Sequence, residues 1–208
     1  MRAFPYAILR VEDANGKVLY QDRPQRERVM STDQAYVLND MLRDVIRYGT
    51  ASGAVKRAGF DLPAAGKTGT TNDYTDVWFI GYTRELVAGF WMGFDTPQTI
   101  KSNAQGGLFA APAWANFMKE VYERRPPPGD WARPTGMVQR EIDVTCGKLA
   151  TPYTPASLRR WEVFSPNNVP TEFCPVPAGA GATPPGGPSP GKGDSFSKPL
   201  KRPPGAGR

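Results

Sequence analysis

The chain has 208 residues and no histidine; 39% of its residues are hydrophobic and its formal net charge is +6. This length allows one ordinary domain with an appendage. The lack of histidine excludes Ser-His-Asp and Cys-His catalysis and every histidine-containing metal site, so a nucleophile would need a lysine or carboxylate as its base. The body of the sequence contains no basic stripe with interleaved aromatic residues, which argues against nucleic-acid binding.

The first elements predicted along the chain are a hairpin and two helices. Residues 6–11 and 17–20 are strand-like, and the pair Asn15-Gly16 between them favours a tight turn. Residues 31–49 predict a helix, because the capping-box pattern S-T-D-Q precedes apolar residues at helical spacing and a final glycine. A shorter helix is expected over residues 51–57.

Two strands and a third helix are predicted next. Residues 77–83 and 86–95 are almost continuously apolar, which is typical of strands in a sheet covered on both faces. A helix is expected from Pro112, and the prolines at 126–128 end it. Residues 131–174 are rich in proline and predict loops and short strands. Aromatic residues at strand spacing are expected in the core rather than on a ligand-stacking surface: Trp78, Phe79, Trp91 and Phe94.

Residues 175–208 differ in composition from the rest of the chain. Half of them are proline or glycine, and Phe196 is their only aromatic residue. Such a segment cannot bury enough apolar surface to offset the entropy of ordering, so we expect a disordered tail. The segment carries four of the six net positive charges. We interpret it as a soluble linker rather than as a contact to anionic polymers at a cell surface.

The two cysteines and the N-terminus indicate little about the compartment. Cys146 and Cys174 fit no metal-ligand spacing, and they either pair in an oxidising compartment or stay free. The apolar run before Arg10 has only six residues, too few for a signal sequence or a membrane span. A complete protein with this N-terminus would be cytoplasmic, whereas in a fragment the targeting segment would lie upstream.

Residues 64–71, A-A-G-K-T-G-T-T, match parts of two different motifs. Gly66-Lys67-Thr68 could end a phosphate-binding loop, but Asp61 stands where that loop requires its first glycine. A strand also follows, where the loop would have to lead into a helix. The nucleotide interpretation is therefore rejected. Lys67-Thr68-Gly69 instead fits a strand that holds a substrate carboxylate through lysine and hydroxyl groups, while glycine leaves room for the substrate backbone.

The surroundings of this motif resemble one family. Residues 65–83, AGKTGTTNDYTDVWFIGYT, are similar almost position for position to the corresponding segment of class A penicillin-binding proteins, with Val77 in place of the family's alanine. The hairpin, the helix before the motif, the strand after it and the C-terminal extension also resemble the family, so the resemblance covers residues 5–174. It implies an α/β (α+β) fold in which an antiparallel central sheet is flanked by helices, with Lys67 on an edge strand beside a cleft.

The resemblance also implies an activity. In this family a serine attacks the D-Ala-D-Ala carbonyl of a peptidoglycan stem peptide, and the amine of a second peptide resolves the acyl-enzyme; β-lactams mimic the first substrate. The implied catalytic residues are Lys67, Thr68 and Gly69. Thr70 and Thr71 would bind the substrate, and the backbone N–H of Thr70 would be an oxyanion donor. The resemblance implies stem peptides and β-lactams as partners, with no cofactor, metal or nucleic acid.

Two of the family's three motifs have no credible match. S-x-x-K with the nucleophile and S-x-N should both precede K-T-G. Ser195-Phe196-Ser197-Lys198 and Ser165-Pro166-Asn167 spell these patterns, but they follow K-T-G and lie in the expected tail and a proline-rich loop. We therefore expect a C-terminal fragment without the serine, inactive alone and with exposed apolar surface. The alternative is a non-catalytic remnant or a module that binds peptidoglycan or a partner subunit.

The expected organisation follows from this assignment. Residues 1–125 would be the C-terminal portion of a transpeptidase domain, residues 126–174 a C-terminal extension and residues 175–208 the tail. The upstream part of the parent protein would carry the nucleophile, a glycosyltransferase domain and a membrane anchor that places it in the cell envelope. Asp73 and Asp76 flank a turn and are expected to cap it rather than to form an acid–base pair.

Overall fold

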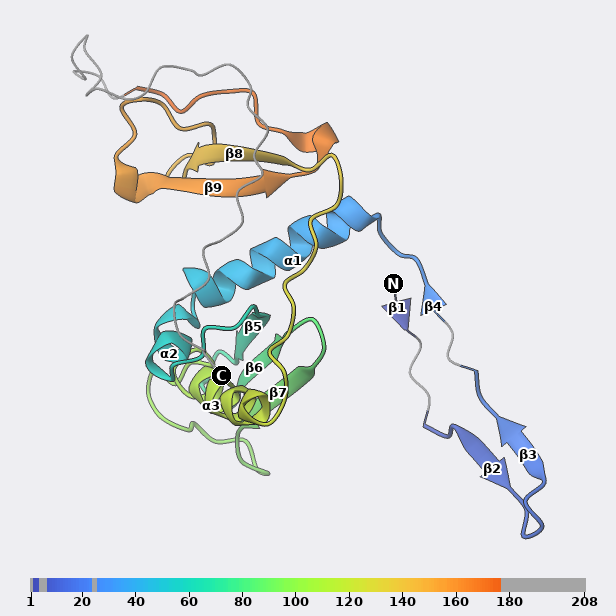
Figure 1. The fold of residues 1–208 in the computed structure, drawn as a ribbon. Coiled ribbons are helices and arrows are strands. Elements are labelled where there is room, and N and C mark those ends of the chain that lie inside the picture. The colour runs from blue at the N-terminus through green and yellow to red at the C-terminus, as the bar shows by residue number, and fades with distance from the viewer. Residues whose placement is uncertain (1, 4–6, 24–25, 177–208) are drawn as a thin grey trace, which may run out of the picture. The chain divides into compact units, whose positions relative to one another are not determined.

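The computed structural model describes residues 2–3, 7–23 and 26–176 (Figure 1). The chain divides into two compact units. Of the described residues, the sheet unit comprises 2–3, 7–23, 26–139 and 163–169, and the C-terminal unit comprises 140–162 and 170–176. The predicted tail lies outside the described residues apart from Pro175 and Val176. Among the described residues, every helix is too short or too polar to traverse a bilayer.

The predicted hairpin is present, although its first strand begins later than expected. β2 (Arg10–Glu12) pairs antiparallel with β3 (Val18–Gln21). Gly16 in the connecting turn has a φ of 79°, a conformation that glycine adopts without steric cost. A second, unpredicted pair joins β1 (Arg2–Ala3) to β4 (Arg26–Glu27), also antiparallel.

The capping box of the first helix is formed as the sequence predicts. α1 (Thr32–Arg47) begins after Ser31, whose side chain accepts from the Gln34 backbone N–H at 3.4 Å, while Gln34 Oε1 accepts from the Ser31 N–H at 3.0 Å. The Gly49 N–H donates to the Asp44 carbonyl at 2.8 Å and closes the C-terminal end. The shorter helix, α2 (Ser52–Arg57), follows.

A three-stranded antiparallel sheet forms the centre of the sheet unit (Figure 1). Its strands are β5 (Ala65–Thr70), β6 (Val77–Tyr82) and β7 (Val87–Met92), in the order β5-β6-β7. The register sets Lys67 opposite Ile80 and Trp78 opposite Trp91. The K-T-G motif therefore lies on an edge strand of the described sheet, as the resemblance implied.

One face of this sheet packs on α3 (Ala110–Glu123). Trp114 of this helix is fully buried, makes edge-to-face contacts with Phe60 and Phe79, and donates its indole N–H to the Gly81 carbonyl at 3.0 Å. A Cβ on Gly81 would lie 2.5 Å from the Trp114 ring. Glycine at this position thus allows the close approach of helix and sheet. Together with α2, these residues form the apolar core.

The other face of the sheet is only partly covered, which corrects the prediction that both faces are covered. At one end of this face Tyr82 donates its hydroxyl to Asn39 of α1 at 3.0 Å, and α1 contacts β5. Trp78, Ile80 and Trp91 remain 43%, 49% and 44% exposed. The prediction of a core position was right for Phe79 and wrong for Trp78, Trp91 and Phe94, all more than two-fifths exposed. Side chains alternate between the faces along a strand, and the described helices bury mainly one face. The exposed apolar surface agrees with the expectation for a fragment.

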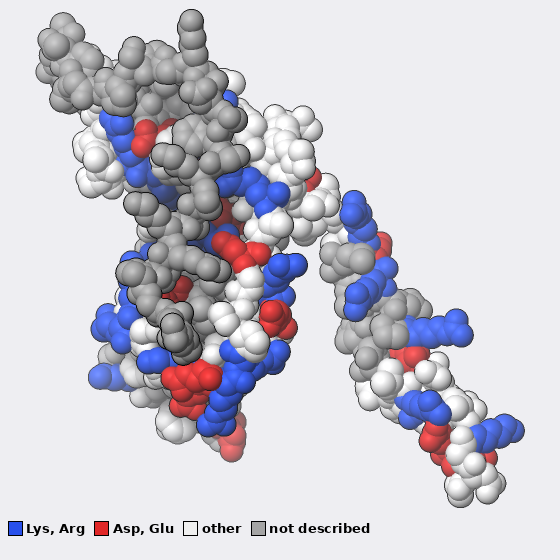
Figure 2. Space-filling view, in the orientation of Figure 1, with Lys and Arg blue, Asp and Glu red and all other residues white. Residues whose placement is uncertain are grey.

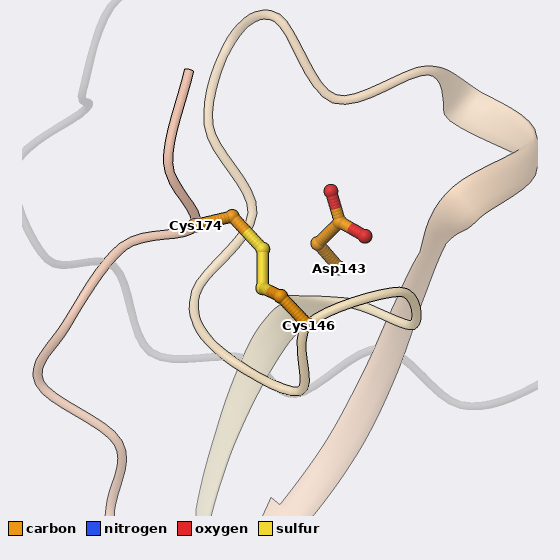
Figure 3. Close-up of side chains that lie close together, drawn as sticks. All are labelled: Asp143, Cys146 and Cys174. Carbon is orange, nitrogen blue, oxygen red and sulfur yellow. A yellow bond between two sulfur atoms is a disulfide. The ribbon is translucent and has the colours of Figure 1, made fainter. Parts of the chain in front are cut away.

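The C-terminal extension consists of short strands and loops, as predicted. β8 (Val138–Asp143) pairs with β9 (Arg159–Phe164). Cys146 and Cys174 form a disulfide with a Cα–Cα distance of 6.1 Å, which decides the alternative that the sequence left open (Figure 3). Asp143 lies beside the two sulfur atoms. Sulfur atoms joined in a disulfide are not thiolates, so this group of side chains is not a metal site.

Figure 2 shows Lys and Arg interspersed with Asp and Glu over the described residues, with Lys and Arg predominating along the arm that carries β2 and β3. Several of these charged side chains are paired with neighbours, including Arg43 with Asp130 at 3.0 Å and Arg47 with Asp40 at 3.0 Å.

Candidate functional site

The K-T-G motif presents a positive charge at the exposed edge of the sheet. Lys67 is exposed on β5, and its Nζ donates to the carbonyl of Thr68 at 2.8 Å. Thr68 and Gly69 are partly exposed and Thr70 is exposed. An exposed edge strand can accept an extended peptide beside it, and an ammonium group there attracts a carboxylate.

The hydroxyls of Thr68 and Thr70 lie on the same side of β5, because residues two apart on a strand share a face. Thr68 Oγ1 is 2.9 Å from the Oγ1 of Thr50, which lies in the connection between α1 and α2. Thr70 Oγ1 accepts from the backbone N–H of Gly106 at 3.1 Å. Both hydroxyls are therefore held by groups from segments distant in sequence.

Sequence reasoning did not single out Gly106 and Gly107, which precede α3 and are both buried. A Cβ on Gly106 would lie 2.2 Å from the Trp78 carbonyl oxygen and 2.6 Å from that of Gly69. A Cβ on Gly107 would lie 2.1 Å from the carbonyl oxygen of Thr50. The segment before α3 thus packs directly on the backbone of the motif. Its only sequence signal is a pair of consecutive glycines before a helix.

The Thr71 hydroxyl closes the turn after β5. It accepts from the backbone N–H groups of Thr75 and Asp76, each at 3.0 Å, in the manner of a hydroxyl-capped turn. These two amides occupy the lone pairs of the oxygen. Direct substrate binding by Thr71 stays a prediction, and the geometry shows this residue shaping the turn beside the motif.

Asp76 ties this turn to β7. Its carboxylate accepts from the Thr75 hydroxyl at 2.8 Å and from the Trp91 indole N–H at 2.9 Å. The hydrogen bond from Thr75, followed by that from Trp91, holds the pKa of Asp76 below its usual value. Asp73 contributes its carbonyl, which accepts from Thr99 at 3.1 Å. The Asp76 carboxylate thus stabilises the turn through two side chains, and capping of the turn by the Asp73 carboxylate stays a prediction.

The structure gives no support for a catalytic site at the two serine-containing patterns, 165–167 and 195–198. Ser165 donates its hydroxyl to Asp33 at 2.6 Å, next to the N-terminus of α1. This bond, followed by the one from Ser31, lowers the pKa of Asp33 to about 2. Ser165 therefore has a structural partner. The pattern at 195–198 lies outside the described residues.

The edge strand β5 thus carries an exposed lysine on one face and two oriented hydroxyls on the other. Comparison with known families matches residues 4–119 to the penicillin binding protein transpeptidase domain and residues 133–178 to the C-terminal domain of penicillin-binding protein 1A. The chain belongs to the penicillin-binding protein transpeptidase family. The two matches together show that it corresponds to the C-terminal part of a class A penicillin-binding protein.

Similar proteins carry the same family name. The chain is 31% identical to penicillin-binding protein 1A of Pseudomonas aeruginosa over 85% of its own length and 27% of that protein. It is 38% identical to penicillin-binding protein 1A of Aquifex aeolicus over 59% of its own length and 16% of that protein. The chain thus spans about a quarter or less of these relatives.

A solved structure shares the fold. Penicillin-binding protein 1A from Haemophilus influenzae superposes with a TM-score of 0.64 at 24% identity, over 83% of this chain and 30% of that one. The mixed α/β fold with an antiparallel sheet, expected from the resemblance, is confirmed by this likeness.

Proposed function

We propose that the chain is the C-terminal part of a peptidoglycan D,D-transpeptidase and supplies the K-T-G strand that lines one side of its acyl-transfer site. The observation that carries the proposal is the position of Lys67, Thr68 and Thr70 on the exposed edge strand β5 of a penicillin-binding fold. A stem peptide could lie along this edge in extended form, using backbone hydrogen bonds for affinity. β-Lactams would occupy the same place.

Each motif residue takes a role that suits its chemistry. Lys67 attracts the substrate carboxylate and favours proton transfer, and the hydroxyls of Thr68 and Thr70 add hydrogen bonds to the substrate. Gly69 keeps the strand free of a side chain where the substrate backbone approaches. The Thr70 N–H donates to the oxyanion, and losing such a donor typically costs about 3–4 kcal/mol of barrier. Thr71 supports these groups through its turn.

The nucleophile is proposed to come from a preceding segment of the parent protein. Ser165 is engaged with Asp33, and a nucleophilic serine needs a lysine one helical turn away. The chain alone would then form no acyl-enzyme. The parent protein is proposed to act in the cell envelope, held by an N-terminal membrane anchor. Residues 1–125 would complete its transpeptidase domain and residues 126–174 would form an extension.

Labelling with fluorescent penicillin tests the proposal. We expect no covalent adduct on the 208-residue chain and a labelled band on the longer protein that carries it. In the longer protein, Lys67→Ala should reduce labelling by at least a hundredfold, while Lys17→Ala in the β2–β3 turn should leave it unchanged. A labelled 208-residue chain whose adduct is abolished by mutating one serine would overturn the proposal. A folded longer protein that binds peptidoglycan without labelling would instead support the non-catalytic module.

A further inference from the structure

We propose that Thr50 and the Gly106-Gly107 pair position the two hydroxyls of β5, so that both Thr68 and Thr70 keep their protons for a ligand carboxylate. The carboxylate in this inference rests on the proposed function. The positions of the hydroxyls rest on contacts among three segments: the α1–α2 connection, β5 and the residues before α3.

The direction of the bond at Thr70 is fixed by chemistry. A backbone N–H can only donate, so Thr70 Oγ1 is the acceptor in its 3.1 Å contact with Gly106. A hydroxyl has one proton and two lone pairs, so this contact leaves the proton of Thr70 free to point elsewhere. Gly106 is itself fixed, because its carbonyl accepts from the N–H groups of Ala110 and Ala111 at 3.0 and 2.8 Å.

The bond at Thr68 can run either way, since both partners are hydroxyls 2.9 Å apart. If Thr50 donates, the proton of Thr68 is left for the ligand. A carboxylate attracts every proton that faces it, and hydrogen bonds to an ionised acceptor are the stronger ones. With a carboxylate bound, the arrangement in which Thr50 donates is therefore favoured. Thr50 is then a positioning residue that acts through Thr68.

The glycine pair allows the segment before α3 to approach the motif closely. The atoms that a Cβ would strike at Gly106 are backbone atoms of Gly69 and Trp78, and at Gly107 they are backbone atoms of Thr50. Backbone atoms held in a sheet or beside a helix cannot move aside as the end of a long side chain can. Glycine at both positions thus lets one buried turn contact the motif and the Thr50 backbone together.

The first test compares two ligands in the longer protein. Penicillin carries a carboxylate, and its methyl ester does not. We expect Thr50→Val to lower the second-order acylation rate with penicillin five- to tenfold and to leave the rate with the ester within twofold. Thr50→Ser, which restores the hydroxyl, should behave as wild type with both ligands. Equal rates of Thr50→Val and wild type with penicillin, or an equal loss with both ligands, would overturn the positioning role.

A second test does not depend on acylation. In the 208-residue chain, the Gly106 amide should exchange its hydrogen at least tenfold faster in Thr70→Val than in wild type, and at the wild-type rate in Thr70→Ser. Unchanged exchange in Thr70→Val would refute the contact. If the longer protein is not labelled at all, the proposed function fails while this exchange still decides the hydrogen-bond geometry. Circular dichroism identifies misfolded variants, and Thr50→Ala replaces Thr50→Val should the latter misfold.

Discussion

The two units of the chain are stabilised by different means. The sheet unit has an apolar core in which Phe79, Trp114 and Met118 are fully buried. In the described part of the C-terminal unit, residues 140–162 and 170–176, the buried residues are Asp143, Thr151, Thr154 and the disulfide-bonded Cys174. A unit this small cannot bury a sizeable apolar core, so a crosslink and polar contacts take its place.

The polar interior is a connected network. Asp143 accepts from the N–H and hydroxyl of Thr145 at 2.9 and 2.6 Å and from the Thr154 hydroxyl at 3.0 Å. Arg159 donates to the carbonyls of Thr154 and Thr151 at 2.7 and 3.1 Å. The difference between the units teaches that an apolar core is sensitive to lost volume, whereas this network is sensitive to the loss of a single donor.

The largest effect is expected from Trp114→Ala in the sheet unit. Removing this buried side chain leaves a cavity beside Phe60 and Phe79 and should lower the free energy of unfolding by about 3–5 kcal/mol. Trp161→Ala, at a position 63% exposed in the other unit, is the matched control and should cost under about 0.5 kcal/mol. Urea titration measures both. Similar losses of unfolding free energy in the two variants would contradict the view that only the sheet unit depends on an apolar core.

Reduction of the Cys146–Cys174 disulfide should have the next largest effect. The crosslink closes a loop of 28 positions, for which chain entropy gives about 3–4 kcal/mol. Amides of residues 140–162 should exchange faster after reduction, while those of β5–β7 keep their rates. The double variant Cys146→Ser/Cys174→Ser should match the reduced protein without reductant. Unchanged exchange over 140–162 would show that the polar network suffices alone.

A smaller effect is expected from Thr154→Val, which keeps the volume but removes a hydroxyl that donates to Asp143 and accepts from the Thr151 N–H. We expect a loss of about 1–2 kcal/mol in the local stability of the C-terminal unit, because these two buried hydrogen bonds are broken. Thr154→Ser retains the hydroxyl and should stay within a few tenths of a kcal/mol of wild type. Hydrogen exchange over residues 140–162 measures both variants, and equal values would assign no role to the hydroxyl.

The smallest expected effects are losses of folding stability at low pH. Hydrogen bonds from Thr145, and more weakly from Thr154, lower the pKa of Asp143, and those from Ser165 and Ser31 lower that of Asp33 to about 2. A lowered pKa means that the folded state binds fewer protons than the unfolded one. The stabilisation by each carboxylate is therefore fully present when the pH is above the ordinary pKa of 3.8. It is lost as the pH falls, and for Asp33 the loss extends down through the lowered pKa of about 2.

Carboxyl NMR titration measures these pKa values. Ser165→Ala should raise the pKa of Asp33 toward its ordinary value and leave that of Asp143 unchanged, because the two carboxylates have separate donors. The C-terminal unit should lose exchange protection first on acidification, since Asp143 is central to its interior. Earlier loss in β5–β7 would contradict the contrast drawn between the units.

Much of the fold was predictable because its signals are local. The capping box at Ser31, the Asn15-Gly16 turn and the helix ended by prolines each depend on a few neighbouring residues. The K-T-G strand and its flanking residues were enough for the family assignment, which the family comparison confirmed. The roles of Lys67 and Thr70 stay predictions.

The sequence by itself determined the family and most elements of residues 6–123 with their order, because spacing and turn chemistry act over short separations; it did not locate β1, β4, β8 or β9. Only the tertiary structure decided which sheet face is covered, because a continuous apolar run in the sequence does not distinguish a strand buried on one face from a strand buried on both. It also decided that the cysteines pair and that Thr50 meets Thr68 across 18 positions. These contacts join segments whose separation along the chain carries no local signal, and packing alone brings them together.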